Sequence, residues 1–428
     1  MCGEGGIVCR MKTDVKQIKN WNLFEWYYTL VMFGYLLTLF VDAMRPGVFA
    51  ALLMLGMAAE LILKKRISFH HTLDWLVAAY FIYNLLSVIW LTRSGLPAKI
   101  YADEFANSVL PVLFYMTGRT AGERTKDFYK KFLLAVFIIC IAGLLLYITA
   151  PQFYLDYLLK WSYISKADAP TMRIRMHSVI GSTILGFLAV CGMLAASYFL
   201  MEKRERKTGI LFFALNFVFA LLSNQRSAMV VAILVVIYVN QLVFFEFRLL
   251  KKKYFFIECA AILAAFLGLC LVSFEVVMKI YYRLVSLPGA IGQRSEQWVA
   301  AVNNMYSYWF GNGLGANGHK ALDFEGTHVI ADGGLIKMFC EEGILGFSIF
   351  LYLLILIFTK GIRNLKACYT ELGIIAIALL QSVGSNILSF QLAAPIFWFA
   401  LGRCADVIIG GTSENADGIE QDRSNLDL

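Results

Sequence analysis

The sequence predicts an all-α, polytopic helical membrane protein, and three observations lead to this class. Hydrophobic residues make up 59% of the 428 positions, charged residues make up only 16%, and the mean hydropathy is +0.67. Soluble domains carry about 25% charged residues, so the composition excludes a soluble enzyme, and the apolar, aromatic-rich chain also excludes disorder. The apolar runs are continuous and approach the roughly 20 residues of a membrane-spanning helix, whereas barrel strands would alternate over about ten residues.

Twelve apolar runs follow one another along the chain, and each is a candidate membrane-spanning helix. Together they form a membrane domain over residues 21–411. We expect residues 1–20 to precede it as a cytoplasmic segment and residues 412–428 to follow it as a short, disordered cytoplasmic tail. The runs are Trp21–Ala43, Gly47–Leu63, Thr72–Leu91, Glu104–Thr117, Phe132–Ala150, Val179–Met201, Ile210–Ser223, Ala228–Phe247, Phe255–Lys279, Gly343–Thr359, Glu371–Phe390 and Ile396–Gly410.

The connections between these runs alternate in charge, and this alternation predicts the orientation. Together with the two termini, the basic set holds about 25 of the 38 lysines and arginines. Basic residues accumulate on the cytoplasmic side of a membrane protein, so we expect both termini in the cytoplasm and an even number of spans. The basic connections are residues 64–66, 119–131, 203–207, 248–253 and 360–366.

One long connection then lies outside the cytoplasm, at residues 281–342, between the ninth and tenth spans. Long ordered connections are usually functional, so this segment is the first place to look for a site. A second outer segment, residues 151–178, is shorter. Both contain tryptophans and tyrosines, which favour the interface between membrane and water.

A glycine-rich stretch, Gly311–Gly318, lies in the long outer segment and imitates a dinucleotide-binding loop. It follows no strand and opens no parallel αβ unit, so we reject that interpretation. We expect these glycines to permit a tight turn or a close approach of the backbone.

Two arginines stand out on the outer side. Arg226 lies in the polar cluster Ser223–Ser227 between two apolar runs, where a charge is costly unless it is paired or faces a wet cavity. It could equally be an interfacial arginine that snorkels. Arg294 begins an aromatic-rich stretch that includes Trp298, and its alternative role is that of a phosphate-facing surface residue on a helix that lies on the bilayer.

His328 and Asp332 belong to the densest set of ionisable groups outside the cytoplasm. A histidine near a carboxylate suits proton transfer near neutral pH. The alternative is an ordinary solvated loop.

The remaining chemistry of the sequence is sparse. The nine cysteines show neither metal-ligand spacing nor a pair in the long outer loops, so we expect no metal, no cofactor and no disulfide framework. The net charge of +8 arises mainly from the cytoplasmic connections, so we expect no nucleic-acid partner.

These residues together resemble the superfamily of O-antigen polymerases and O-antigen ligases. The resemblance is specific in the last third of the chain, whereas residues 1–200 match in topology only. Asn224–Ser227 places an arginine just after a polar turn, although the family more often has serine or threonine at Gln225. The other matching residues are Arg294, Trp298, Gly311, Gly313, Gly315, Leu335, Glu341, Gly343 and Gly346.

One departure separates the two branches of this superfamily. Ligases typically carry His-Asn where this chain has Asp332-Gly333, and His328 lies four residues earlier. Polymerases vary more at this point, so the polymerase is favoured over the ligase.

The resemblance implies a multi-pass glycosyltransferase of a bacterial cytoplasmic membrane, with its active site facing outside. Its substrate would be a polyprenyl-diphosphate-linked oligosaccharide, which it would polymerise into an O-antigen, capsule or exopolysaccharide. Arg226 and Arg294 would bind the diphosphate, because arginines stay charged and can fork onto phosphate oxygens. His328 or Asp332 would act as general base on the acceptor hydroxyl.

Trp298, Gly313 and Glu341 would support this site. Membrane lipid would surround the protein, and a flippase and a chain-length regulator would be its assembly partners. The alternative within the superfamily is a ligase that transfers finished glycan to an acceptor. The alternative from another class is a polysaccharide flippase or secondary transporter, although the late, external position of the long segment argues against the two-half symmetry of many transporters.

Overall fold

A computed structural model describes residues 71–160, 175–249 and 287–426, apart from residues 94, 179, 203 and 323. It also describes single residues within 52–69 and 278–285. The expected first span, most of the second and almost all of the ninth lie outside the described residues.

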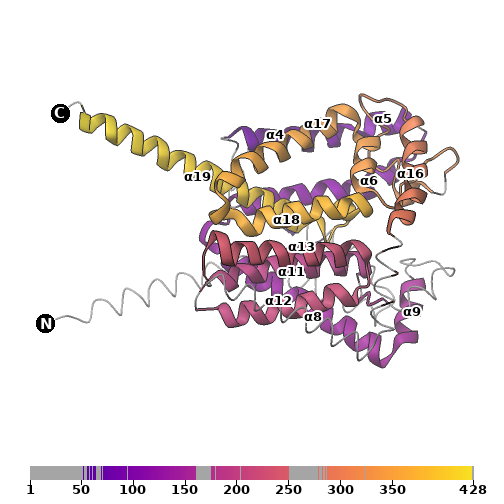
Figure 1. The fold of residues 1–428 in the computed structure, drawn as a ribbon. Helices are drawn as coiled ribbons and strands as arrows, with labels where there is room; N and C mark the ends of the chain where they lie inside the picture. The colour runs from indigo at the N-terminus through magenta and orange to yellow at the C-terminus, as the bar shows by residue number, and fades with distance from the viewer. Residues whose placement is uncertain are drawn as a thin grey trace.

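Every element in the described part of the chain is a helix, and no strand occurs there. The all-α class predicted from composition is therefore confirmed for this part (Figure 1). The main elements are α4 (Thr72–Leu86), α5 (Val88–Arg93), α6 (Ala98–Glu104), η1 (Phe105–Val109), η2 (Leu110–Leu113), α7 (Phe114–Arg119), α8 (Thr125–Thr149), α9 (Pro151–Lys160), α11 (Ser182–Met201), α12 (Arg206–Leu222), α13 (Arg226–Gln241), η4 (Leu242–Glu246), α16 (Leu287–Asn303), α17 (Gly334–Arg363), α18 (Leu365–Gly384), η6 (Ile387–Ser389) and α19 (Ala394–Leu426). Two short turns, η3 (Gly122–Arg124) and η5 (His319–Ala321), complete them.

Six helical segments in this part are long and apolar enough to cross a membrane. Each overlaps a span expected from the sequence, which supports a helical membrane protein. The total of twelve spans and the side of the two termini stay predictions. The six segments are Thr72–Leu91, Thr125–Thr149, Ser182–Met201, Arg226–Glu246, Gly334–Arg363 and Leu365–Gly384.

The expected run Glu104–Thr117 is helical but consists of several short pieces. It begins at the end of α6 and continues through η1, η2 and α7. Pro111 lies in η2, and because proline has no backbone N–H it interrupts the regular hydrogen-bonding pattern of an α-helix. This irregular passage carries Glu104 and Ser108 into the interior, where the candidate site lies.

Helix α11 lies at the centre of the described bundle and packs against α8, α12, α13 and α18. Small residues allow these close contacts. A Cβ added at Gly186 would lie 2.7 Å from the Ala228 side chain, and one added at Gly192 would lie 2.5 Å from Asn216 Oδ1. Small residues at helix interfaces are typical of membrane bundles, where packing drives association.

The outward faces of the bundle are apolar as well as its core. Large exposed side chains include Ile148 on α8, Ile237 on α13 and Ile355 on α17. A soluble helix would place polar residues on such a face, whereas a helix that is apolar all round lies in a core or a bilayer. The outer surface is therefore suited to lipid.

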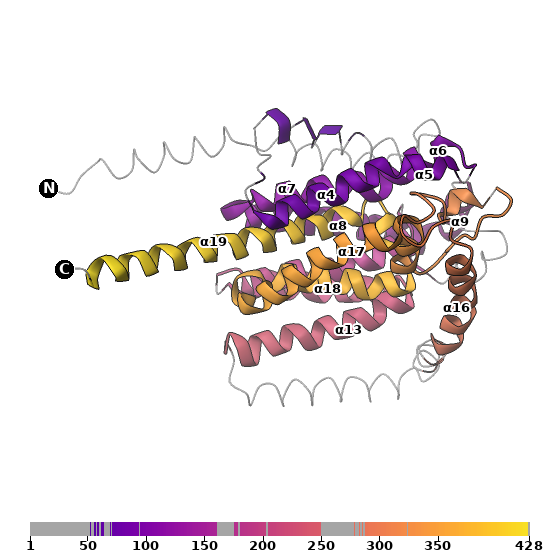
Figure 2. The same cartoon turned by 90° about the horizontal axis from the view of Figure 1, so that it is seen from above.

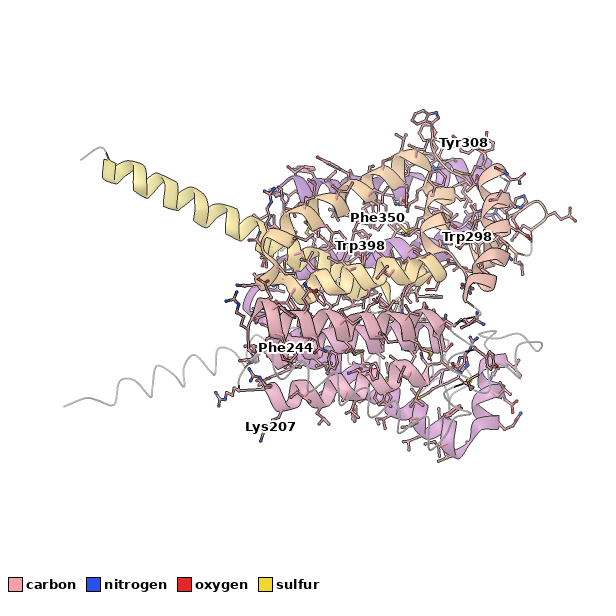
Figure 3. All side chains as sticks on the ribbon, in the orientation of Figure 1. Lys207, Phe244, Trp298, Tyr308, Phe350 and Trp398 are labelled. Atoms are coloured by element: carbon pink, nitrogen blue, oxygen red, sulfur yellow. The ribbon has the colours of Figure 1, made fainter. Side chains whose placement is uncertain are left out.

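The two ends of the bundle differ in composition. Figure 3 shows Lys207 at one end and Trp298 and Tyr308 at the other. The end of α19 also projects from the Lys207 end (Figures 1 and 2). The side of the membrane that each end faces stays a prediction.

The last helix continues into the expected tail, because α19 ends at Leu426. The expectation of a disordered tail at residues 412–428 stays a prediction. Extending an existing helix costs much less than nucleating a new one, so the apolar first half of α19 provides a start for the polar half.

Candidate functional site

The long helix α17 is broken at Gly343, and this break organises the candidate site. Gly343 has φ 65° and ψ −172°, a conformation that L side chains avoid. The two N–H groups after the break leave the helix: Ile344 donates to Tyr308 O at 2.8 Å, and Leu345 donates to Trp309 O at 3.1 Å. The connection after α16 therefore supplies the acceptors that the helix lacks.

The same connection also supplies donors to the carbonyls left free by the break. Asn312 N–H donates to Cys340 O at 2.8 Å, and Gly313 N–H donates to Glu341 O at 3.0 Å. Buried backbone groups are costly when unpaired, so this exchange of four hydrogen bonds stabilises a broken helix.

The glycines of this connection are needed because the backbones approach so closely. Gly311 has φ 77°, and a Cβ on it would collide with the Glu341 carbonyl. A Cβ on Gly313 would lie 2.7 Å from the backbone of Leu91. The close backbone approach expected for Gly311–Gly318 is therefore found, and Gly313 has a structural role beside Glu341.

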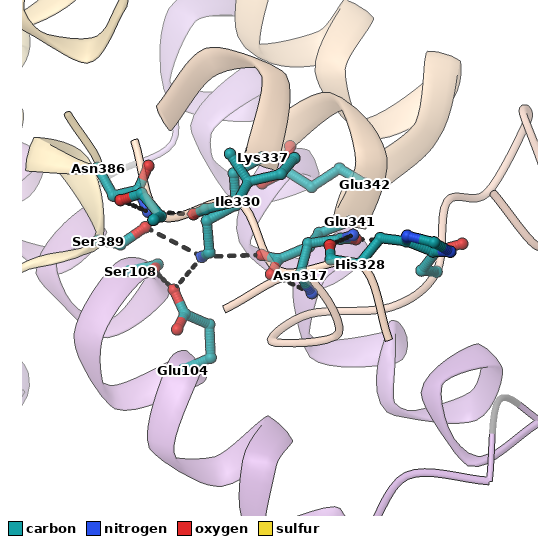
Figure 4. A network of polar contacts seen from close by, with 12 residues as sticks. Glu104, Ser108, Asn317, His328, Ile330, Lys337, Glu341, Glu342, Asn386 and Ser389 are labelled. Carbon is teal, nitrogen blue, oxygen red and sulfur yellow. Dashed lines mark hydrogen bonds and ion pairs between the residues drawn. The ribbon is translucent and has the colours of Figure 1, made fainter. Parts of the chain in front are cut away.

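Lys337 is buried next to this connection, between the carboxylates of Glu104 and Glu341 (Figure 4). The side chain of Lys337 is only 2% exposed. Its ammonium donates to Glu104 Oε1 at 2.6 Å, to Glu341 Oε2 at 3.1 Å and to Ser389 Oγ at 3.2 Å. Three elements, α6, α17 and η6, are thereby joined by one cation.

Glu104 lies on α6, outside the six candidate spans, and receives further hydrogen bonds. Ser108 O–H donates to its Oε1 at 2.5 Å. The charge of Lys337 and these hydrogen bonds offset the cost of burying a negative charge on Glu104. Glu104 is therefore an anion that fixes Lys337 in place.

Asn317 connects this buried network to the loop that carries His328. Its N–H donates to Glu341 Oε1 at 3.1 Å, and its Nδ2 donates to His328 O at 2.7 Å. Asn386 holds the next residues of the loop, because its Nδ2 donates to Ile330 O at 2.8 Å. These hydrogen bonds to backbone carbonyls hold the loop in place. The side chain of His328 itself is partly exposed.

Three of the predicted site residues meet where α17 begins. Arg294 Nη2 lies 2.7 Å from Asp332 Oδ2, and both side chains are partly exposed, at 30% and 37%. Trp298 Nε1 donates to Asp332 O at 2.7 Å. Arg294 also reaches the carboxyl end of α18, with Nη1 at 3.5 Å from Gly384 O. The pair lies at the end of the bundle opposite Lys207.

The guanidinium of Arg294 and the start of α17 together form surroundings that attract negative charge. Arg294 supplies a planar guanidinium with several N–H donors, and α17 begins at Gly334, two residues after Asp332. The free N–H groups and the dipole of a helix N-terminus attract negative charge. In this structure the anion beside Arg294 is the Asp332 carboxylate itself.

The other predicted residues lie elsewhere. Arg226 is the first residue of α13, which packs against α11, α12 and α18, whereas α16 packs against α17. Glu341 is buried in the Lys337 network. The structure therefore brings Arg294, Trp298 and Asp332 together, and it joins Gly313, Glu341 and the His328 backbone in a second, adjoining group.

Sequence reasoning missed Lys337, Glu104 and Asn317. The spacing of Lys337 and Glu341 is that of an i,i+4 helix pair, which was a visible signal. Glu104 gave no such signal, because 233 residues separate it from Lys337.

Comparison with known proteins adds no relative: no family model matches the chain, and no curated protein sequence matches it. The functional assignment therefore depends on the residues and their geometry.

Proposed function

We propose that the chain is a glycosyltransferase of a bacterial cytoplasmic membrane that polymerises polyprenyl-diphosphate-linked oligosaccharide units into a surface polysaccharide. The main support for this proposal is the Arg294–Asp332 ion pair at the start of α17, where Trp298 donates a hydrogen bond to the Asp332 carbonyl. The guanidinium of this pair is partly exposed, on an apolar bundle and at the end opposite a basic connection.

The chemistry requires such a site. The bond between the anomeric carbon of the sugar and the diphosphate oxygen breaks, and the hydroxyl oxygen of the acceptor sugar forms the new bond. The electron pair leaves with the polyprenyl diphosphate, so negative charge builds up on its oxygens. Fixed cations that meet this charge stabilise the transition state, and Arg294, which lies beside Asp332 and Trp298, would supply one of them. Arg226 lies on α13, away from this pair, and its role as a second diphosphate ligand stays a prediction.

The acceptor hydroxyl also loses a proton, which a general base must take. Asp332 and His328 are the two candidates from the sequence. The geometry favours Asp332, because a diphosphate bound to Arg294 would compete with Asp332 for the guanidinium. The displaced carboxylate would then lie beside the reacting groups and be free to accept the proton.

The ligase and the flippase are distinguished by their products. A ligase would transfer glycan from the polyprenyl carrier to a different acceptor, so its product would leave the carrier. A flippase would move the lipid-linked unit across the membrane without joining sugars. Neither alternative is favoured by a particular observation in the described structure.

The test of the site uses purified protein and lipid-linked oligosaccharide. Arg294→Ala is expected to lower polymerisation by about 100-fold or more, as the loss of one preorganised donor does in other transferases and hydrolases. The control is Arg363→Ala, since Arg363 is exposed and ends α17 far from Asp332. Equal activity of the two folded variants would contradict the assignment of Arg294.

A further inference from the structure

Glu342 is a buried carboxyl group that the proposed reaction does not use. It is the last residue of α17 before the break at Gly343, and it is only 2% exposed. Its neighbour Glu341 points to Lys337, whereas Glu342 points to a different side of the helix (Figure 4). The two acids therefore have different surroundings.

One oxygen of Glu342 has a clear hydrogen-bond partner, whereas the other meets no partner at hydrogen-bond geometry, although the Asn84 side chain also lies against this carboxyl group. Tyr80 O–H donates to Oε1 at 2.6 Å. No hydrogen-bond partner reaches the buried Oε2 within the described structure. The side chain lines a small cavity between α4, α17 and α19, whose walls include Phe350, Leu388 and Trp398. An ionised carboxylate that is buried with one oxygen unpaired would be very costly.

The charged groups around Glu342 do not offset a negative charge on it. From its own helix, the described ionisable neighbours are Lys337 and Glu341, and the ammonium of Lys337 is already bonded to two carboxylates. From α4, the titratable neighbours are Tyr80 and Tyr83, and Tyr83 O–H donates to the backbone Glu342 O at 2.5 Å. From α19, the cavity is lined by Trp398, and from η1 and η6 by Ser108 and Ser389, all of which are uncharged.

The number of buried charges also disfavours a negative charge on Glu342. Glu104, Glu341 and Glu342 would bring three negative charges into the bundle against the single positive charge of Lys337. The break at Gly343 adds to this imbalance, because the C-terminal end of the half-helix before it carries partial negative charge. Glu342 lies at that end.

We infer that Glu342 is a proton-binding site in the interior of the bundle, occupied at neutral pH. Because Tyr80 donates to Oε1, Oε1 is the carbonyl oxygen of the acid, and the proton is held on Oε2, where it faces the cavity. When the pH is raised, the proton passes to hydroxide and the carboxylate is left behind. Ser108 and Ser389 line the same cavity and bond Glu104 and Lys337. The inference does not depend on the proposed glycan chemistry.

Infrared difference spectroscopy on the full-length protein in lipid tests this directly. Subtracting the spectrum of Glu342→Gln from that of the wild type at neutral pH should reveal a lost carbonyl stretch of a protonated carboxylic acid. The wild-type band should fade as the pH is raised, with a matching gain of carboxylate bands. Glu296→Gln is the control, because Glu296 is exposed on α16 and its replacement should remove carboxylate bands only.

A second variant keeps the test independent of how well Glu342→Gln folds. Tyr80→Phe removes the hydrogen bond to Oε1, so the acid band should persist and move to higher frequency. Loss of carboxylate bands alone in Glu342→Gln would overturn the inference. An acid band that does not respond to Tyr80→Phe would overturn it as well.

Discussion

At the scale of single residues, Lys337 is the described side chain on which the interior of the site depends most. It is nearly fully buried, and its three hydrogen bonds reach three different elements. A buried ion pair contributes little net stability compared with an apolar pair, but removing one partner leaves the other charges uncompensated. The two carboxylates beside Lys337 make that loss severe.

We therefore expect Lys337→Met to lower the free energy of unfolding by about 3–5 kcal/mol. The measurement is thermal or denaturant unfolding of the purified protein in detergent. Lys366→Met is the matched control, because Lys366 is 66% exposed and lies 3.6 Å from Glu246. An exposed pair contributes about 1 kcal/mol or less, so similar effects of the two replacements would contradict the role of Lys337.

The residues of the site also mark the limit of prediction from sequence. Arg294, Trp298 and Asp332 fall in one outer segment and are suggested by residue type and by resemblance, yet their actual contacts were not predicted. The bond between Glu104 and Lys337 could not be predicted, because it depends on how α6 packs under the glycine-rich connection. Local patterns identify side chains with chemical potential, but packing decides which of them meet.

At the scale of elements, α17 and the connection after α16 form one unit. The helix is broken at Gly343, and the four backbone groups exposed by the break are paired by residues 308–313. The sequence predicted a span beginning at Gly343 and left the stretch before it, up to residue 342, in the long outer connection. The structure shows both as halves of one helix with a non-helical residue between them.

Replacing Gly311 by alanine should disrupt this unit. The new Cβ would collide with the Glu341 carbonyl in a backbone conformation that alanine avoids, so we expect destabilisation of about 1–3 kcal/mol. Gly292→Ala is the control, since a Cβ at this position of α16 would meet nothing within 4 Å. Helical glycine-to-alanine replacements are neutral or stabilising by up to about 1 kcal/mol. Unfolding midpoints that change equally in both variants would contradict the close approach.

At the scale of the whole molecule, composition predicted the class, and the helical, lipid-suited bundle agrees with it. This agreement is expected physically, because only helices or closed barrels satisfy their backbone groups within lipid. Lys207 lies at one end of the bundle, and Trp298 and Tyr308 lie at the other (Figure 3). The proposed orientation assigns the Lys207 end to the cytoplasm.

This orientation predicts the outcome of labelling with a membrane-impermeant maleimide. In a background without native cysteines, Tyr308→Cys should be labelled in intact cells, because Tyr308 is exposed and lies at the end that this orientation places outside. Lys207→Cys should be labelled only after the membrane is opened. The reverse pattern would place the proposed site in the cytoplasm and contradict its role on exported, lipid-linked glycans.

The proposed polymerase activity is tested most directly by reconstituting the purified chain in liposomes with a polyprenyl-diphosphate-linked oligosaccharide and no other protein. We expect a ladder of longer glycans still attached to the carrier, with one polyprenyl diphosphate released for each new bond between units. Unchanged single units, or diphosphate released without any new bond between units, would contradict it.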